Sequence, residues 1–152
     1  MDIDKLIKQA TLEKNSAAKE AYRAIKAEIL LNDSSKKPKK YGKDIQLPNG
    51  EFINELLISI IRKLIKEREE QISMYDANSR KDLADIYRNQ MSYLKNLLPP
   101  EISKEEILNS IYGFYPNGFT QKEMGNVIKT IKEIYPTADG KIISDVAKQF
   151  IH

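Results

Sequence analysis

Apolar residues at helical spacing are the feature that most constrains this chain. They recur three and four positions apart over most of the sequence, and no run alternates between polar and apolar residues for long. A period near 3.6 residues is typical of amphipathic helices, whereas strands show a period of two. The longest patterned stretch, residues 52–76, would form a helix about 37 Å long. The sequence therefore predicts an all-α fold with one long helix as its spine.

Four helices are expected before residue 98. A short one over about residues 2–14 precedes a second, which Asn15 would cap and which carries a narrow stripe of small residues. After the long helix, the sequence Ser79-Arg80-Lys81-Asp82 has the form of a capping box and would start a fourth helix. The apolar face of the long helix comprises Phe52, Ile53, Leu56, Leu57, Ile60, Ile61, Leu64, Ile65, Ile72 and Tyr75.

Three shorter helices are expected after Pro99-Pro100, which would stop the fourth helix because proline lacks a backbone N–H. Capping boxes with flanking apolar residues begin at Ser103 and Thr120, Pro136 would end the second of these helices, and Asp139 would cap the last. Their expected core comprises Ile107, Ile111, Met124, Val127, Ile128, Ile131, Ile143, Val146 and Phe150.

The predicted organisation is thus an N-terminal helical bundle of about four helices over residues 1–98, followed by a small three-helix C-terminal domain over residues 101–152. A chain of 152 residues can bury such cores without metal or disulfide staples. With 41% hydrophobic and 31% charged residues, the composition is that of a folded rather than a disordered chain.

A lysine-rich segment interrupts the bundle at residues 33–50 and is expected to be an exposed loop that ends in the Pro48-Asn49-Gly50 turn. Residues 1–98 hold 19 Lys and Arg against 15 Asp and Glu, so without five of these lysines their net charge of +4 would fall to −1. A flexible run of cations attracts phosphate without sequence preference, and a solubilising insertion is the alternative. The five are Lys36, Lys37, Lys39, Lys40 and Lys43.

Few catalytic groups are available. The chain has no cysteine, and its one histidine is the last residue, His152, which argues against a thiol nucleophile, a disulfide scaffold, a zinc or iron–sulfur site and a histidine-centred triad. Ser59, Ser92 and Ser110 lie within helical patterns. The sequence contains neither of the glycine-rich motifs that bind phosphate, G-x-x-x-x-G-K-S/T and G-x-G-x-x-G. We therefore expect no catalytic residues, no metal and no cofactor.

Two other clusters have structural as well as functional interpretations. The carboxylates around Glu67 alternate with Lys63, Lys66 and Arg68, which favours ordinary surface ion pairs. Aromatic side chains gather around one turn in the C-terminal part, where they could stack bases, fill a partner's groove or form the corner of a small core. These are Tyr112, Phe114, Tyr115 and Phe119.

Targeting signals are not evident. The N-terminus carries two early acids and no apolar run of the kind found in signal peptides, and the most apolar stretch, residues 56–61, is followed directly by Arg62. A bilayer-spanning helix needs about 20 apolar residues. The sequence predicts a cytoplasmic protein without membrane contact.

Several motifs together resemble the GatB/YqeY family. They are IKEREEQISMY at residues 65–75, SRKDLA at 79–84, LKNLLPPEISKEEI at 94–107, KEMGNV at 122–127 and ADGKII at 138–143. The resemblance covers nearly the whole chain apart from the lysine-rich loop. One departure is that the glycine usual before the arginine of the second motif is Ser79 here.

The resemblance implies a free-standing relative of the tail of the Asp/Glu-tRNA amidotransferase B subunit, a helical module that helps to hold transfer RNA. Its implied partners are tRNA and an amidotransferase or aminoacyl-tRNA synthetase. Members of the family often carry the label of a carbon–nitrogen ligase with glutamine as amido donor, an activity that these residues do not support independently.

Three functions follow as alternatives. The first is a non-catalytic accessory module linked to tRNA-dependent amidation, which contacts RNA through the five lysines, with Arg80 and Lys81 as secondary candidates. The second is a protein-interaction module that does not bind RNA. The third is the glutamine-dependent ligase implied by the family label.

Overall fold

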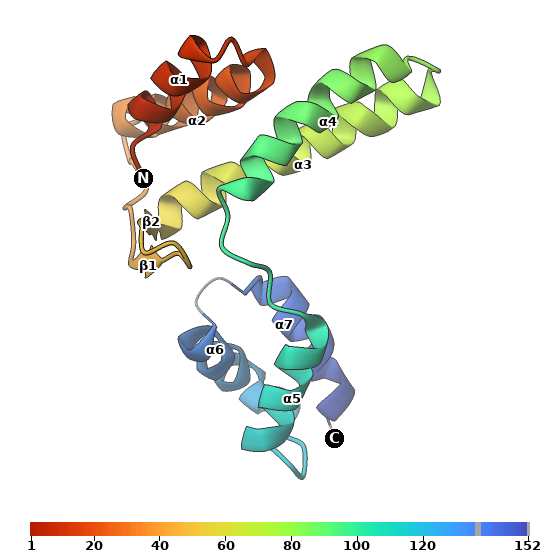
Figure 1. Cartoon of the computed structure of the whole chain (residues 1–152). Coiled ribbons are helices and arrows are strands. Elements are labelled where there is room, and N and C mark those ends of the chain that lie inside the picture. Colours follow the sequence, from red (N-terminus) through yellow and green to blue (C-terminus); the bar gives the residue numbers. More distant parts are fainter. Residues whose placement is uncertain (136–137, 152) are drawn as a thin grey trace. The chain divides into compact units, whose positions relative to one another are not determined.

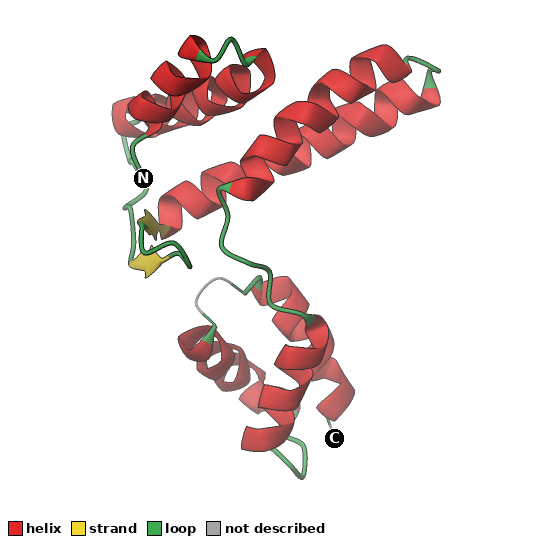
Figure 2. Cartoon of the chain, viewed as in Figure 1, coloured by secondary structure: helices red, strands yellow, loops and turns green. Residues whose placement is uncertain are grey.

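The computed structural model describes residues 1–135 and 138–151, and its chain is mostly helical, as the sequence predicts (Figure 1). Within these residues, strands form one short hairpin (Figure 2), and Phe119 pairs with Ile151 in an isolated β-bridge. The chain forms two compact units, Met1–Pro99 and Pro100–His152, called here the N-terminal and C-terminal units. Pro136 and His152 lie outside the described residues.

The N-terminal unit contains four helices and the hairpin. Three of its helices begin at a side-chain cap: Asp2 accepts a hydrogen bond from the backbone N–H of Lys5, Asn15 from that of Ala18, and Asn54 from that of Leu57. In chain order the elements are α1 (Ile3–Leu12), α2 (Ser16–Ser34), β1 (Asp44–Gln46), β2 (Phe52–Asn54), α3 (Glu55–Ala77) and α4 (Lys81–Asn96).

The core of this unit forms where α2 and α4 pack against the first half of α3. The stripe of small residues on α2 is buried at Ala18 and Ala21, which lets neighbouring helices approach closely. Asn15 adds a polar tie, because its side chain donates to the hydroxyl of Tyr93 on α4 at 2.7 Å. The buried residues of α3 are Leu56, Leu57, Ile58, Ile60, Ile61, Leu64 and Ile65.

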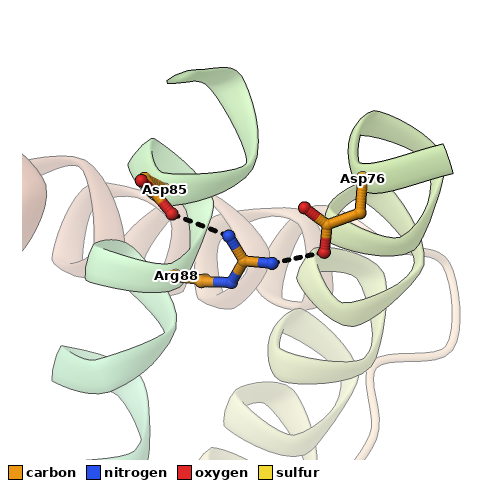
Figure 3. A network of polar contacts seen from close by, with 3 residues as sticks. All are labelled: Asp76, Asp85 and Arg88. Carbon is orange, nitrogen blue, oxygen red and sulfur yellow. Dashed lines mark hydrogen bonds and ion pairs between the residues drawn. The ribbon is translucent and has the colours of Figure 1, made fainter. Parts of the chain in front are cut away.

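The far half of the α3–α4 hairpin combines polar contacts with the stacked rings of Tyr75 on α3 and Tyr87 on α4. Arg88 of α4 donates to Asp85 of its own helix at 2.6 Å and to Asp76 of α3, and so bridges the two helices (Figure 3). The hydrogen bond to Asp85 raises the pKa of Arg88 above its ordinary value. Ile72 and Tyr75, expected on the apolar face of α3, are only half-buried in this part.

The structure corrects the start of the long helix. Phe52 and Ile53 belong to β2, which pairs antiparallel with β1 so that Ile53 lies opposite Ile45, and α3 begins only at Glu55. Ile53 is 2% exposed and joins the core from the strand. The segment expected to be a loop therefore contains a hairpin, and its predicted turn is closed by the N–H of Gly50, which donates to the carbonyl of Leu47 at 2.9 Å.

The predicted capping box at Ser79 is wrong. Ser79 has a φ of +58°, and Arg80 takes the N-cap position of α4 without a side-chain cap. The reason is that Ser79 completes the end of α3: its N–H donates to the carbonyl of Asp76, and the N–H of Arg80 donates to that of Tyr75. This pair of bonds is a Schellman motif, which requires a left-handed residue at that position.

The C-terminal unit is a small group of helices packed around one apolar core. Its helices begin where predicted: Ser103 accepts from the N–H of Glu106, Thr120 forms a capping box with Glu123, and Asp139 accepts from the N–H of Lys141. The elements are α5 (Lys104–Phe114), a 3₁₀ turn (Gln121–Glu123), α6 (Met124–Ile134), α7 (Gly140–Ala147) and a second 3₁₀ turn (Lys148–Phe150). The buried residues are Ile107, Ile111, Phe119, Val127, Ile131, Ala138, Ile143, Val146 and Ala147.

Candidate nucleic-acid interface

The lysine loop, defined here as residues 36–43, joins the end of α2 to the hairpin. Its five lysine side chains are all exposed. Within residues 1–135 and 138–151, none of the five ammonium groups forms an ion pair with a carboxylate. Five positive charges in eight residues are therefore available to a ligand.

The first half of the loop is tied to the last turn of α2. The side chain of Asn32 accepts a hydrogen bond from the backbone N–H of Lys39 at 2.9 Å and donates one to its carbonyl at 3.1 Å. The hydroxyl of Tyr41 donates to Asp33 at 2.7 Å. This hydrogen bond raises the pKa of Tyr41 above its ordinary value.

The second half is tied to the first turn of α3. The N–H of Leu56 donates to the carbonyl of Tyr41 at 3.0 Å, and that of Glu55 donates to the carbonyl of Lys43 at 3.1 Å. Gly42 lies between them with a φ of +74°, where a side-chain Cβ would come within 2.9 Å of the Cβ of Glu55. The loop is thus held at Lys39, Tyr41 and Lys43, although the sequence indicated a flexible run.

Arg80 and Lys81 do not join this site. The helix α3 separates them from the lysine loop, and its 23 residues span about 34 Å. Arg80 donates to both carboxylate oxygens of Asp82, each at 3.1 Å, which raises the pKa of Arg80 and lowers that of Asp82. The charge of Arg80 is therefore compensated, whereas Lys81 is exposed and has no ion pair within the described parts of the chain.

Two of the three serines that lie within helical patterns, Ser59 and Ser110, have other partners. The hydroxyl of Ser59 donates to the carbonyl of Leu56 at 2.8 Å, and that of Ser110 lies 3.0 Å from the hydroxyl of Tyr135. Neither contact provides the base that nucleophilic catalysis requires.

The expected ion pairs along α3 need correction. Lys63 reaches across to Glu28 of α2 at 3.0 Å rather than to an acid of its own helix, and this hydrogen bond raises the pKa of Lys63. Arg68 donates instead to Gln90 of α4 and to the carbonyl of Leu64, and its partial burial lowers its pKa. Sequence spacing within one helix missed these partners because they lie on the neighbouring helices or on the backbone.

The aromatic cluster of the C-terminal unit divides in two. Phe119 is buried and packs edge-on against Tyr115, so this half is part of the core. Tyr112 and Phe114 are 59% and 57% exposed, and Tyr112 contacts the ring of Phe150. Only this second half is accessible to a ligand.

Tyr41 is a candidate that the sequence analysis missed. It is 47% exposed and lies within the lysine loop between Lys40 and Lys43. The signal that could have identified it is an aromatic residue interleaved with cations, a pattern typical of surfaces that bind single-stranded nucleic acid.

Neither a candidate metal site nor a membrane-spanning helix is found in residues 1–135 and 138–151. No cluster of three or more His, Cys, Asp or Glu suited to a metal ion occurs in residues 1–135 and 138–151. In the same ranges, no helix has both the length and the apolar character needed to cross a membrane.

These features define a small helical protein whose candidate site is an exposed cationic loop. The chain belongs to the Yqey-like protein family, whose profile matches residues 1–151. The family predicted from the sequence motifs is thereby confirmed, and the match extends across the lysine loop. Comparison with curated proteins found no match.

Proposed function

We propose that this protein is a non-catalytic accessory module that binds transfer RNA through the lysine loop and so serves tRNA-dependent amidation. The observation that carries the proposal is the set of five exposed lysines without ion pairs among the described residues, on a loop tied to α2 and α3. Lysines that neutralise the phosphates of a nucleic acid release the cations condensed on it, which favours binding.

The fixed path of the loop also favours binding. A disordered segment loses conformational entropy when it folds on a ligand, at a cost of about 1–2 kcal/mol per residue for the backbone. The bonds from Asn32 to Lys39 and from Leu56 to Tyr41 restrict this loop before RNA arrives. Less entropy is then lost on binding, so a modest number of phosphate contacts suffices.

The resemblance to the tail of the amidotransferase B subunit favours tRNA over other polyanions. An amidotransferase or an aminoacyl-tRNA synthetase acts on the same RNA, and each is a candidate partner for the complex. The residues provide no activated nucleophile for glutamine hydrolysis, so catalysis is assigned to such a partner.

The test is tRNA binding measured by fluorescence anisotropy over a series of salt concentrations. If about four lysines contact phosphates, the logarithm of affinity should fall with the logarithm of salt at a slope of about −3 to −4. Replacing the five loop lysines with glutamine should lower affinity at least about tenfold and flatten this slope. A slope near zero for the wild type would contradict the proposal.

A matched control removes the same charge elsewhere. Five exposed lysines of the C-terminal unit are changed to glutamine, so that both variants have the same net charge. This control should bind tRNA nearly as well as the wild type, and an equal loss in both variants would assign binding to overall charge rather than to the loop. The control positions are Lys104, Lys122, Lys129, Lys132 and Lys141.

A second candidate function is contact with a protein partner through the C-terminal unit. Residues 99–152 hold six Lys and Arg against seven Asp and Glu, a net charge of −1, which does not favour RNA. The exposed rings of Tyr112 and Phe114 favour an apolar contact instead. Crosslinking in cells, scored separately for RNA and protein, distinguishes the two functions, and protein partners that survive nuclease treatment and are lost in a Tyr112→Ser/Phe114→Ser variant would support this one.

A further inference from the structure

Tyr41 is the aromatic residue of the lysine loop. Lys39 and Lys40 precede it, Lys43 follows it after Gly42, and it is 47% exposed. Nearly half of this side chain is open to solvent, and Tyr41 is not among the residues packed against the core of the unit. An exposed aromatic ring among cations suits a ligand that combines an apolar face with negative charge.

Tyr41 is held at its hydroxyl and at its backbone. Its hydroxyl donates to Asp33 at 2.7 Å, and its backbone carbonyl accepts from Leu56 at 3.0 Å. One bond uses the hydroxyl and the other the backbone, so neither occupies a face of the ring. The side chain is therefore fixed before a ligand binds, which reduces the entropy lost on binding.

We propose that Tyr41 is a stacking platform for one unpaired base of the RNA, with Lys39, Lys40 and Lys43 on the flanking phosphates. The inference rests on the proposed function and specifies its substrate class: a single-stranded segment rather than a duplex stem. Bases within a duplex have both faces covered by their neighbours, whereas an unpaired base offers a free face to an aromatic ring.

Paired variants separate stacking from anchoring. Tyr41→Phe and Tyr41→Leu both lose the bond to Asp33, but only the phenylalanine keeps an aromatic face. With a single-stranded oligonucleotide, Tyr41→Leu should bind about 5-fold to 100-fold more weakly than the wild type, and Tyr41→Phe should retain most of the affinity. Equal losses in the two variants would show that Tyr41 only anchors the loop and would overturn the inference.

The RNA form gives a second comparison. A duplex of the same length and sequence presents the phosphates without a free base face. Tyr41→Leu should lower affinity for the single strand and change affinity for the duplex by less than about twofold. A wild type that binds the duplex at least as tightly as the single strand, with the same loss from Tyr41→Leu on both, would contradict the proposal.

A direct readout is available because the chain contains no tryptophan. A Tyr41→Trp variant places the sole indole of the protein at the proposed contact. Single-stranded RNA should quench its fluorescence strongly through stacking, and the duplex should quench it little. Saturation with single-stranded RNA without quenching would overturn the inference.

Failure of this inference is distinguishable from failure of the proposed function. If replacing the loop lysines weakens tRNA binding while Tyr41→Leu does not, the loop binds phosphates and Tyr41 plays no part. If the wild type binds neither tRNA nor single-stranded RNA, both proposals are wrong.

Discussion

The lysine loop adjoins the first turn of α3, whereas Arg80 and Arg88 lie beyond its last turn, and both regions are rich in cations. The lysines of the loop have no ion pairs with described residues, but Arg80 is bound by Asp82 and Arg88 by Asp76 and Asp85. Among the described residues, all five lysines of the loop are thus without an ion pair, whereas of Arg80, Lys81 and Arg88 only Lys81 is. The sequence gives the number of cations in a region, but only cations without an ion pair in the fold are free to bind a ligand.

The largest effect on this comparison should come from disturbing the frame of the loop. Gly42→Ala forces a φ of +74° on a residue with a Cβ and places that Cβ 2.9 Å from the Cβ of Glu55. We expect a loss of about 1–3 kcal/mol in the stability of the loop and weaker tRNA binding. Hydrogen exchange at the amides of Glu55 and Leu56, which bond to the loop, measures this opening.

Gly50→Ala is the matched control for Gly42→Ala. Gly50 also has a positive φ, +90°, but a Cβ there meets nothing within 4 Å. The control should share the backbone strain and lack the clash with Glu55, so it should leave exchange at Leu56 close to that of the wild type. Equal acceleration in both variants would assign the effect to backbone strain alone.

The next effect concerns the tip of the α3–α4 hairpin. Ser79 has a φ of +58°, a conformation that disfavours residues with a Cβ, so Ser79→Gly should raise the free energy of unfolding by about 0.5–1 kcal/mol. Urea denaturation measures the gain. Because the tip is far from the lysine loop, tRNA affinity should not change.

Lys14 provides a control for Ser79→Gly, because it has a φ of +56° at the end of α1 and its N–H donates to the carbonyl of Thr11. Lys14→Gly should stabilise the N-terminal unit to a similar extent. A lower urea midpoint in either glycine variant would refute the assignment of strain to these two positions.

A smaller effect should follow when Arg80 is released. Asp82→Asn removes the carboxylate that Arg80 contacts at two oxygens, and the tip then offers a free guanidinium. The salt dependence of tRNA binding should steepen by about 0.7–0.9 in slope if the RNA reaches this end of α3. Asp85→Asn changes net charge equally but leaves Arg88 bound to Asp76, so an identical change in both would contradict the comparison.

The smallest expected effect is the pH dependence of the stability that the Arg80–Asp82 ion pair contributes. The hydrogen bond from Arg80 lowers the pKa of Asp82 below its ordinary value of 3.8. A carboxyl with a lower pKa in the folded state stabilises that state above its unfolded pKa, and this contribution disappears as pH falls through the folded pKa. NMR titration should show the Asp82 carboxyl moving toward its ordinary pKa in an Arg80→Gln variant, and an unchanged titration would rule out the pair in solution.

Helix content could be predicted from the sequence because apolar spacing reports directly on the buried face of each helix. The hairpin was missed for the same reason: Phe52 and Ile53 continue the apolar stripe of α3, so the spacing predicts the start of that helix where this strand of three residues lies. On the other side of the hairpin, Ile45 and Leu47 alternate with polar residues, and the sequence predicts the Pro48-Asn49-Gly50 turn. The pairing was missed because the spacing assigns the apolar residues after that turn to the long helix.

The sequence predicts which lysines form the candidate site, but not the hydrogen bonds that hold their loop. Exposure of the five lysines follows from their charge and from the loop residues around them. The hydrogen bond between Asn32 and Lys39 could not be predicted from the sequence, because an asparagine near a helix end has many local partners available. The same limit explains the failed capping box, since Ser79 serves the end of α3 and not the start of α4.

One consequence of the tie at Asn32 concerns how this loop can change during evolution. Asn32 binds the backbone N–H and carbonyl of position 39 and makes no use of the lysine side chain there. Mutations at the cationic positions can therefore alter the electrostatic strength of the surface while the loop keeps its course. Selection for affinity acts here on the lysine side chains, whereas selection for folding acts on the backbone of position 39 and the side chain of Asn32.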